Sequence, residues 1–270
     1  METIVISGSF DNIQSKDVRF LEEASKLGSV YVLLWSDEAV TVKTGFKPRL
    51  PLRERRYILK GLRYVHKVAL LDSVSIGDEL LRVEELKPRI WVVNKDSHSL
   101  QKQAFCTSKG ILYSIIQDVD LIGYPVAKSS VSPSQKVVVT GCFDWFHSGH
   151  VRFFEETSEF GDLYVIVGND KNVRLLKGPD HPLIPEDERC YMVRSIRFVT
   201  QAMVSSGTGW LDGRPEIEML QPAMYAVNED GDQPEKREFC RKNGVEYLVL
   251  KRRPATGLSS RNSTRFRAER

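Results

Sequence analysis

Residues 136–150 read Lys-Val-Val-Val-Thr-Gly-Cys-Phe-Asp-Trp-Phe-His-Ser-Gly-His, an apolar run that passes through a short turn into His147-x-Gly149-His150. The apolar run predicts a buried strand, and the motif after the turn predicts the start of a helix. A helix N-terminus presents free N–H groups and the positive end of the helix dipole, so it binds phosphate. Histidines three residues apart share one face of the first turn and can reach the same phosphate oxygens, while Gly149 leaves room for a close ligand.

An altered copy of this stretch lies earlier in the chain. Residues 8–20 read Gly-Ser-Phe-Asp-Asn-Ile-Gln-Ser-Lys-Asp-Val-Arg-Phe, and residues 141–153 read Gly-Cys-Phe-Asp-Trp-Phe-His-Ser-Gly-His-Val-Arg-Phe. The first copy lacks the histidines and the middle glycine, and carries Gln14, Lys16 and Asp17 in their places. Further matches follow in the same order: 30–37 with 163–170, 51–57 with 185–191, 63–65 with 197–199, 91–96 with 225–230, and 105–106 with 239–240. The preserved order predicts an internal duplication with two units of ordinary domain size.

The fold class that we expect is α/β, with two tandem Rossmann-like domains that each hold a doubly wound parallel sheet. Short apolar runs that alternate with helical patterns are typical of such sheets. In the second copy we expect strands at 136–140, 162–167, 201–204, 224–227 and 247–250, and helices at 151–160, 186–196, 215–220 and 233–243. We place the first domain at 1–128, a Ser- and Pro-containing linker at 129–134, and the second domain at 135–270.

Composition excludes several classes of protein. With 270 residues and 41% hydrophobic content, the chain can form two cores. It has no apolar run of about 18 residues for a membrane span and no signal peptide, so we expect a cytoplasmic protein. The four cysteines have no metal-ligand spacing and form no disulfide framework, and a net charge of +3 is too small to indicate nucleic acid. No Gly-x-Gly-x-x-Gly follows either first strand, which excludes a dinucleotide-dependent oxidoreductase.

The motif Gly141-x-Phe143-Asp144-x-x-His147-x-Gly149-His150 resembles the signature of the cytidylyltransferase-like nucleotidyltransferases. These Rossmann-like enzymes join a nucleoside triphosphate to a phosphorylated small molecule and release pyrophosphate. The resemblance covers the second copy nearly end to end and the first copy in framework only. It implies a catalytic role for both histidines, and a nucleotide-binding role for Gly141, Cys142, Phe143, Asp144 and Gly149.

Further features of this family follow along the second copy. The resemblance implies that Lys177 contacts the triphosphate and holds charge in the transition state, and that Arg189 of Pro185-x-x-x-Arg189 contacts phosphates or the acceptor. Either side chain could instead be an ordinary surface charge. The loop after the fourth strand carries Asn228, Asp230 and Asp232, which are expected near the nucleobase or the acceptor, or else in a simple polar turn.

The C-terminal segment resembles the family element that grips the β- and γ-phosphates. Two registers fit it, one over 257–261 and one over 262–267. We favour the second, with Ser263, Thr264 and Arg267, because Ser-Thr-x-x-Arg is intact there. The basic run 251–253 before it is expected to contact phosphate. Trp210 and the glycine-rich stretch 205–215 could shape the acceptor pocket or form a surface loop.

The function that these features favour is transfer of CMP from CTP to a phosphorylated alcohol, polyol phosphate or phosphonate, with Mg²⁺ carried by the triphosphate. An ATP-dependent adenylyltransferase and a non-catalytic nucleotide-binding regulatory protein are the alternatives. The first copy is expected to be inactive, because Asp17 would repel a polyphosphate. Both copies keep an Arg-aromatic-Val segment, at 63–65 and 197–199, which lies at a dimer interface in related enzymes. We therefore expect the copies to pack as an internal pseudo-dimer, in a monomer or a dimer of such chains.

Overall fold

The computed structural model describes residues 2–72, 74–126 and 134–261. The chain divides into two compact units, Met1–Gly123 and Tyr124–Arg270, which we call the first and second units. This division falls a few residues before the predicted boundary at 128. Of the predicted linker, residues 129–133 lie outside the described ranges.

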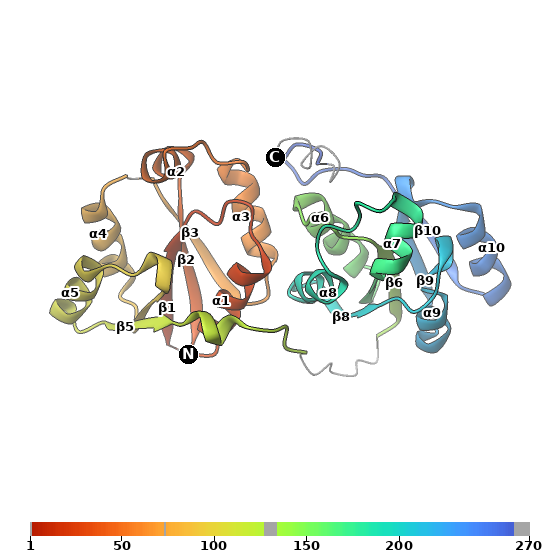
Figure 1. Ribbon diagram of the computed structural model, residues 1–270, viewed down its shortest axis with the longest axis horizontal. Helices are drawn as coiled ribbons and strands as arrows, with labels where there is room; N and C mark the ends of the chain where they lie inside the picture. Colours follow the sequence, from red (N-terminus) through yellow and green to blue (C-terminus); the bar gives the residue numbers. More distant parts are fainter. Residues whose placement is uncertain (1, 73, 127–133, 262–270) are drawn as a thin grey trace. The chain divides into compact units, whose positions relative to one another are not determined.

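The first unit is a five-stranded parallel sheet with helices between its strands (Figure 1). Its strands are β1 (Thr3–Gly8), β2 (Ser29–Trp35), β3 (Val65–Leu71), β4 (Ile90–Asn94) and β5 (Leu112–Ile116), in the order β3-β2-β1-β4-β5. Its helices are α1 (Ser15–Ser25), α2 (Asp37–Thr44), α3 (Leu52–Gly61), α4 (Ile76–Leu86) and α5 (Leu100–Lys109), with short 3₁₀ turns η1 (Lys95–Ser97) and η2 (Asp118–Leu121).

The second unit has the same architecture (Figure 1). Its strands are β6 (Lys136–Gly141), β7 (Asp162–Val167), β8 (Val199–Val204), β9 (Met224–Asn228) and β10 (Glu246–Leu250), in the order β10-β9-β6-β7-β8. Its helices are α6 (Ser148–Ser158), α7 (Asp170–Lys177), α8 (Glu186–Arg194), α9 (Arg214–Leu220) and α10 (Pro234–Asn243), with 3₁₀ turns η3 (Gly209–Leu211) and η4 (Glu229–Gly231). In both units the first strand is central and the chain winds outward in two directions, which confirms the predicted fold class.

The strand order places a crevice at the carboxyl end of β6. Strands β6 and β7 are paired along their whole length, from Lys136 to Gly141. Strands β6 and β9 are paired only at Val137 and Val138, so they part toward their carboxyl ends. Ligands of doubly wound sheets bind in the crevice at such a switch in winding direction. The turn that follows β6 therefore lies where a ligand is expected.

The core explains why these segments form strands. Val137, Val138 and Val139 are all fully buried, so β6 is covered on both faces and shows a continuous apolar run rather than an alternating one. On α6, Val151 and Phe154 are also fully buried, and their spacing of three residues places them on one face of the helix. The hydrophobic effect thus fixes α6 against the sheet, with its N-terminus at the end of β6.

The predicted bounds of the elements in the second unit agree with the structure to within two residues except at the start of α6, and one helix was missed. Helix α6 begins at Ser148, three residues before the predicted start, because the His147 ring caps it by accepting the Gly149 N–H. Helix α7 was not predicted, although Asn169 caps it by accepting the Asn172 N–H. Of its apolar residues Val173 is buried, whereas Leu175 and Leu176 are 68% and 38% exposed, so its buried face is small.

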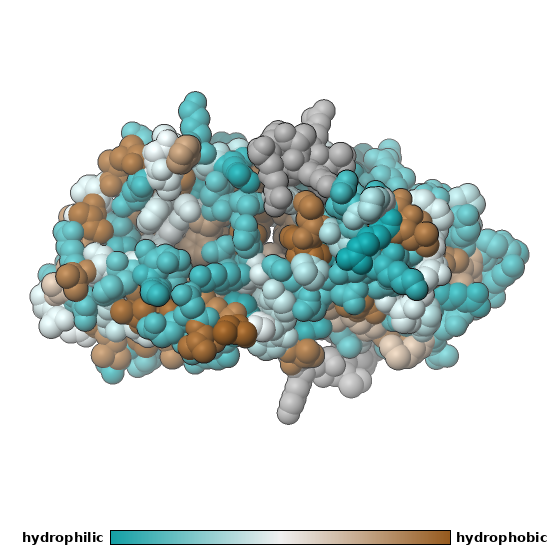
Figure 2. All heavy atoms as spheres, in the orientation of Figure 1, coloured by the Kyte–Doolittle hydropathy of each residue, from teal (hydrophilic) through white to brown (hydrophobic). Residues whose placement is uncertain are grey.

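The surface has scattered apolar residues. The most exposed large hydrophobic side chains among the described residues are those of Phe46, Leu100, Ile122 and Val126, each at least 75% accessible. On the face shown in Figure 2, hydrophobic residues occur in patches among hydrophilic ones. Within the described ranges, no helix is both long enough and apolar enough to cross a membrane.

Candidate functional site

The two motif histidines form a stacked pair at the start of α6. Their ring centroids are 4.0 Å apart and the ring planes differ by 17°. His147 Nδ1 accepts the backbone N–H of Gly149 at 3.1 Å, so a neutral His147 ring carries its proton on Nε2. His150 Nδ1 is buried and has no hydrogen-bond partner among the described residues. The structure thus brings together the two imidazoles that the sequence predicts to act on one phosphate.

Burial keeps both imidazoles neutral. Together with smaller effects of the charges of Arg252 and Arg261, it lowers the pKa of His147 to about 3. Burial also lowers the pKa of His150 well below its usual value, with additional effects of His147, Arg252 and Lys177. At neutral pH these rings are therefore hydrogen-bonding groups rather than charges. Positive charge in the site has to come from arginine and lysine.

The glycines and Phe143 shape the turn around these rings. A Cβ at Gly149 would lie 2.9 Å from His147 Cε1, and a Cβ at Gly141 would lie 2.7 Å from the Phe143 ring. Phe143 adopts a left-handed backbone with φ 53°, and its ring packs edge-on against His150 at 5.2 Å. Gly149 thus gives room to the histidine ring as well as to the ligand that the sequence predicted.

Asp144 anchors the turn to the loop before α8. It is 8% exposed, and its Oδ1 accepts the N–H groups of Leu183 at 2.8 Å and Ile184 at 2.9 Å. Asp11 of the first unit accepts the equivalent pair of N–H groups from Arg49 and Leu50. Because the aspartate of each unit accepts the equivalent pair of N–H groups, its visible role is structural, and its contact with nucleotide stays a prediction.

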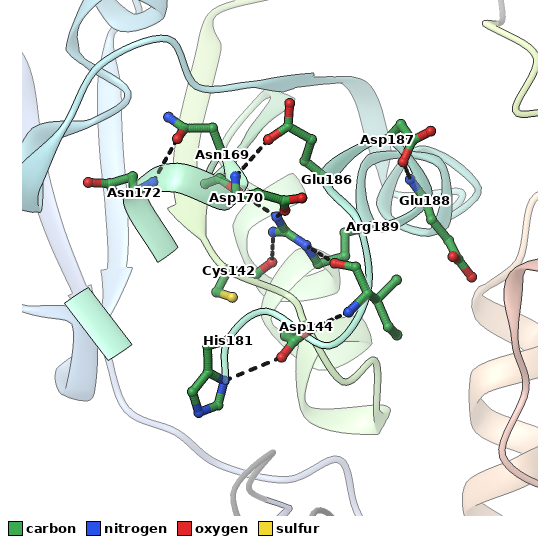
Figure 3. Close-up of polar contacts among 12 residues, drawn as sticks. Cys142, Asp144, Asn169, Asp170, Asn172, His181, Glu186, Asp187, Glu188 and Arg189 are labelled. Carbon is green, nitrogen blue, oxygen red and sulfur yellow. Dashed lines mark hydrogen bonds and ion pairs between the residues drawn. The ribbon is translucent and has the colours of Figure 1, made fainter. Parts of the chain in front are cut away.

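Arg189 links three segments near the motif turn through hydrogen bonds to their backbone carbonyls (Figure 3). It is 1% exposed, and it donates to the carbonyl oxygens of Ile184, Cys142 and Gly168 and to Asp170 Oδ1. A guanidinium has five N–H donors, so these bonds leave one for a ligand. Arg55 of the first unit makes the corresponding contacts with Leu50, Ser9 and Asp37. The contacts show a structural role for Arg189, and its predicted contact with phosphate stays a prediction.

A basic pocket flanks the N-terminus of α6. Its lining from α6 consists of Ser148, Gly149, Arg152, Phe153 and Glu156. The opposite wall consists of Asn228, residues 251–255 and residues 259–261. Five of these residues are arginine or lysine and one is glutamate, so the pocket attracts anions. Here the structure places Asn228 and the run 251–253 beside the motif, and their predicted contacts with nucleotide or acceptor stay predictions.

Sequence reasoning did not single out two of the pocket residues, Arg152 and Glu156. They lie one and two helical turns into α6, where an ion pair at 2.7 Å joins them. An arginine and a glutamate spaced by four residues are common on helix surfaces, so only the proximity of the 251–261 segment could identify them. Residues 259–261 of the disfavoured C-terminal register line this pocket. The favoured Ser263, Thr264 and Arg267 lie outside the described residues.

The acidic loop residues do not act as one group. Asp230 pairs with Arg252 at 2.6 Å, and Arg252 also donates to the Arg261 carbonyl at 2.7 Å, so Asp230 helps to hold the pocket wall. Asp232 instead pairs with Arg237 and accepts the Tyr247 hydroxyl at 3.0 Å. The bond from Arg237 lowers the pKa of Asp232. Of the two aspartates, only Asp230 bears directly on the basic pocket.

Lys177 acts electrostatically on residues of the motif turn. It is the last residue of α7, and its side chain is exposed. Its charge lowers the pKa of His150, whereas Arg261 lowers that of His147. It also opposes the rise that burial causes in the pKa of the Cys142 thiol. Arg252 thus acts on both rings, Arg261 acts on His147, and Lys177 acts on His150.

In the first unit the residues at the corresponding positions pair with other side chains and with the backbone of the same unit. Asp17 accepts the Gln14 N–H at 2.9 Å and caps α1, and Lys16 forms ion pairs with Asp118 at 2.9 Å and Asp96 at 3.9 Å. In the matched numbering, Asp118 stands where the second unit has Arg252. The first unit thus presents carboxylates where the second unit presents a guanidinium.

Comparisons with known proteins agree with this geometry. The family described as cytidylyltransferase-like matches residues 138–268. An FAD synthase of Ferroglobus placidus is 38% identical over 120 residues, which are 43% of this chain and 75% of that protein. An FAD synthase of Methanocella paludicola is 44% identical over 119 residues, which are 43% of this chain and 81% of that protein.

Two matches of lower identity cover very different shares of the matched proteins. The bifunctional protein HldE of Geobacter sulfurreducens is 29% identical over 116 residues, which are 43% of this chain and 23% of that protein. A lipopolysaccharide core biosynthesis protein of Thermoplasma volcanium GSS1 covers 48% of this chain and 99% of its own, with 20% identity and a TM-score of 0.38. That structural similarity is too low to bear on function.

Proposed function

The chain belongs to the cytidylyltransferase-like nucleotidyltransferases, and we propose that its second unit transfers a nucleoside monophosphate group from a nucleoside triphosphate to a phosphorylated small molecule. The observation that carries this proposal is the stacked pair His147 and His150 at the N-terminus of α6, beside a basic pocket. Free N–H groups, neutral imidazole donors and surrounding cations together suit a polyphosphate.

The chemistry proposed is an in-line displacement. A phosphate oxygen of the acceptor forms a bond with the α-phosphorus, the bond from the α-phosphorus to the bridging oxygen breaks, and pyrophosphate leaves with that electron pair. The acceptor oxygen is already anionic, so no base has to remove a proton. Catalysis then consists of positioning and of stabilising the charge that develops on the α-phosphate.

Neutral imidazoles suit this task. Each ring can donate one N–H to an oxygen of the α-phosphate or to the bridging oxygen without first losing a proton. The tautomer of His147 is set by the Gly149 N–H, which makes Nε2 the donor. The pocket residues Arg252 and Arg261 would neutralise the leaving pyrophosphate. In this proposal the histidines supply hydrogen bonds, and the arginines supply positive charge.

We propose that Mg²⁺ arrives with the triphosphate. Among the described residues no group of three or more histidine, cysteine, aspartate or glutamate side chains could hold a metal. Phosphate oxygens and water would therefore be its ligands, as is common for this ion. Bound there, Mg²⁺ would neutralise charge on the β- and γ-phosphates.

The nucleobase is the finer part of the proposal. The sequence motif favoured CTP, with ATP as the alternative. Relatives named FAD synthase favour ATP, because the product in that name contains an adenylyl group. We therefore propose ATP as the first donor to test and CTP as the second, and FMN, polyol phosphates and phosphonates as acceptors.

The test combines binding with turnover. Thermal unfolding of the full chain with Mg²⁺ and each of ATP, CTP, GTP and UTP identifies the donor, because a ligand that binds only the folded state raises the Tm. Pyrophosphate release is then measured with that donor and each acceptor in turn. Release that requires both substrates supports the proposal. Binding of a nucleotide without release for any acceptor would favour the non-catalytic alternative instead.

A further inference from the structure

Arg152 lines the basic pocket from α6 and is held there by two carboxylates. Its Nη1 lies 2.9 Å from Glu155 Oε2, and its Nη2 lies 2.7 Å from Glu156 Oε1. These are its polar contacts among the described residues, where its Nε is buried without a hydrogen-bond partner. A guanidinium has five N–H donors, so one N–H remains on each terminal nitrogen. The side chain is 31% exposed, and a ligand in the pocket can therefore reach it.

The first unit has the same arrangement with one additional bond. Val-Arg-Phe occurs at 18–20 and at 151–153, so Arg19 matches Arg152. Arg19 also forms ion pairs with two glutamates of its own helix, at 2.5 Å each. In addition, its Nη2 donates to the carbonyl oxygen of Asp120 at 2.9 Å, and its side chain is only 4% exposed. The backbone of the first unit thus supplies an acceptor that covers this arginine.

The segment that supplies this acceptor has a different sequence in the second unit. Asp120 belongs to η2, which packs against α1. The strands β5 and β10 that precede the two segments match with an offset of 134 residues, so residues 252–255 correspond to η2. In the second unit these residues line the pocket, and within the described ranges they form no hydrogen bond with Arg152. A ligand in the pocket can therefore supply the acceptor that η2 supplies in the first unit.

The position of Arg152 along α6 corresponds to one part of a triphosphate. Ser148 and Gly149 line the pocket at the first turn of the helix, and Arg152 follows one turn later, about 6 Å along the axis. In the proposed reaction the α-phosphate lies at the histidines of the first turn, and the leaving pyrophosphate extends into the pocket. The terminal phosphate then comes closest to Arg152. A guanidinium binds such an anionic group through paired N–H donors.

We propose that Arg152 binds the terminal phosphate of the nucleoside triphosphate, and that the second unit thereby distinguishes triphosphates from shorter nucleotides. This inference rests on the proposed function. Glu155 and Glu156 are the positioning residues, because each holds one terminal nitrogen of the guanidinium. The distinction serves the reaction, since only a triphosphate releases pyrophosphate when the bond at the α-phosphorus breaks.

The first experiment measures binding of nucleotides that differ only in the number of phosphates. Isothermal titration with Mg²⁺ gives the Kd of AMP, ADP and ATP, and of CMP, CDP and CTP, for wild type and Arg152→Ala. We expect the Kd of the triphosphate to rise roughly ten- to hundredfold, as for loss of a charge-assisted hydrogen bond. The Kd of the monophosphate and of the diphosphate should stay within about twofold of wild type, because neither reaches Arg152. The preference of wild type for the triphosphate should therefore largely disappear.

Three further variants control this comparison. Arg152→Lys keeps the positive charge but loses the fork of donors, so it should recover part of the lost affinity. Arg152→Gln keeps N–H donors for the two glutamates and replaces Arg152→Ala if circular dichroism shows that the alanine variant is unfolded. Arg241→Ala is the matched control, because Arg241 forms an ion pair with Glu238 on α10, and no described residue of that helix lines the pocket. It should leave all six Kd values unchanged.

The outcomes are separable. An unchanged Kd of the triphosphate in folded Arg152→Ala, or an equal rise for mono-, di- and triphosphate, overturns the inference. Equal affinity of wild type for the diphosphate and the triphosphate overturns it as well. In each of these cases pyrophosphate release by wild type would still support the proposed transfer reaction. Absence of binding and of pyrophosphate release with every nucleotide overturns the proposed function, and the inference with it.

Discussion

At the scale of single residues, the stacked histidines carry the strongest prediction. His147→Ala and His150→Ala each remove one hydrogen-bond donor, and loss of such a donor lowers kcat about 10²- to 10³-fold. Pyrophosphate release measures kcat, and circular dichroism confirms that each variant is folded. Gln14→Ala changes the residue at the position of His147 in the first unit and should leave kcat unchanged. Turnover near wild type in either histidine variant would exclude the proposed roles.

The same burial predicts a dependence of stability on pH. The pKa of His147 is about 3 when folded and about 6.5 when unfolded, so the unfolded chain binds an additional proton between these values. The contribution to stability is therefore complete above about pH 6.5 and is lost as the pH falls below it. Between pH 7.5 and 5.5 one such histidine costs about 1.4 kcal/mol. Urea unfolding of wild type and His147→Gln at both pH values should show this loss reduced by that amount, and equal losses would contradict it.

Residue types predicted the chemistry of the site better than they predicted each contact. The histidines and Gly149 belong together because their motif is local, and a helix brings residues three apart onto one face. The contacts of Arg189 and Asp144 depend on loops far along the chain, which a pattern of neighbours does not contain. The ion pair of His181 with Asp144 could not be predicted for the same reason, since the two residues are 37 positions apart in the sequence.

At the scale of elements, the buried arginines Arg55 and Arg189 form a matched pair. Each fastens the turn after the first strand to the loop after the second. Lysine cannot reproduce the fork of bonds, so Arg189→Lys and Arg55→Lys should each lower stability by about 3–5 kcal/mol, because buried acceptors lose their partner. Denaturant unfolding measures this loss. Unchanged stability with a raised donor KM in Arg189→Lys would instead show that its main contact is with phosphate.

Strands were easier to predict than the helix that carries Lys177. The central strands of a parallel sheet are apolar throughout, and their sequence shows it. Helix α7 has only eight residues, so its apolar positions Val173, Leu175 and Leu176 span barely two turns, which is too short to establish a helical period. Its capping residue Asn169 was the one local signal, and a single cap is weak evidence for a helix.

At the scale of the whole molecule, the two units should differ in what they bind. The second unit has the donors and the basic pocket, and the first has Lys16 paired with Asp118 at the corresponding place. Isothermal titration of the full chain with the donor and Mg²⁺ should therefore give one site per chain. Arg252→Ala, which removes a pocket cation, should weaken that site. A stoichiometry of two would contradict the inactivity of the first unit.

The repeated sequence predicted two domains that each hold a doubly wound parallel sheet, because the hydrophobic pattern and the turn signals recur along the chain. The packing of the units as a pseudo-dimer stays a prediction, since the Arg-aromatic-Val segments suggest an interface only through resemblance. The chain boundary between the units depended on composition alone, and composition locates a linker only to within several residues.

The exchange of Arg252 for Asp118 between the units has a consequence for how the protein can change over time. Removing Lys16 alone would leave the carboxylates of Asp96 and Asp118 without this cation. Replacing Asp118 alone by arginine would place a second cation beside Lys16. Each of these two single substitutions therefore places like charges near one another. The residues of the first unit can therefore acquire other surface functions by single substitutions. A return to transfer chemistry would require several substitutions together.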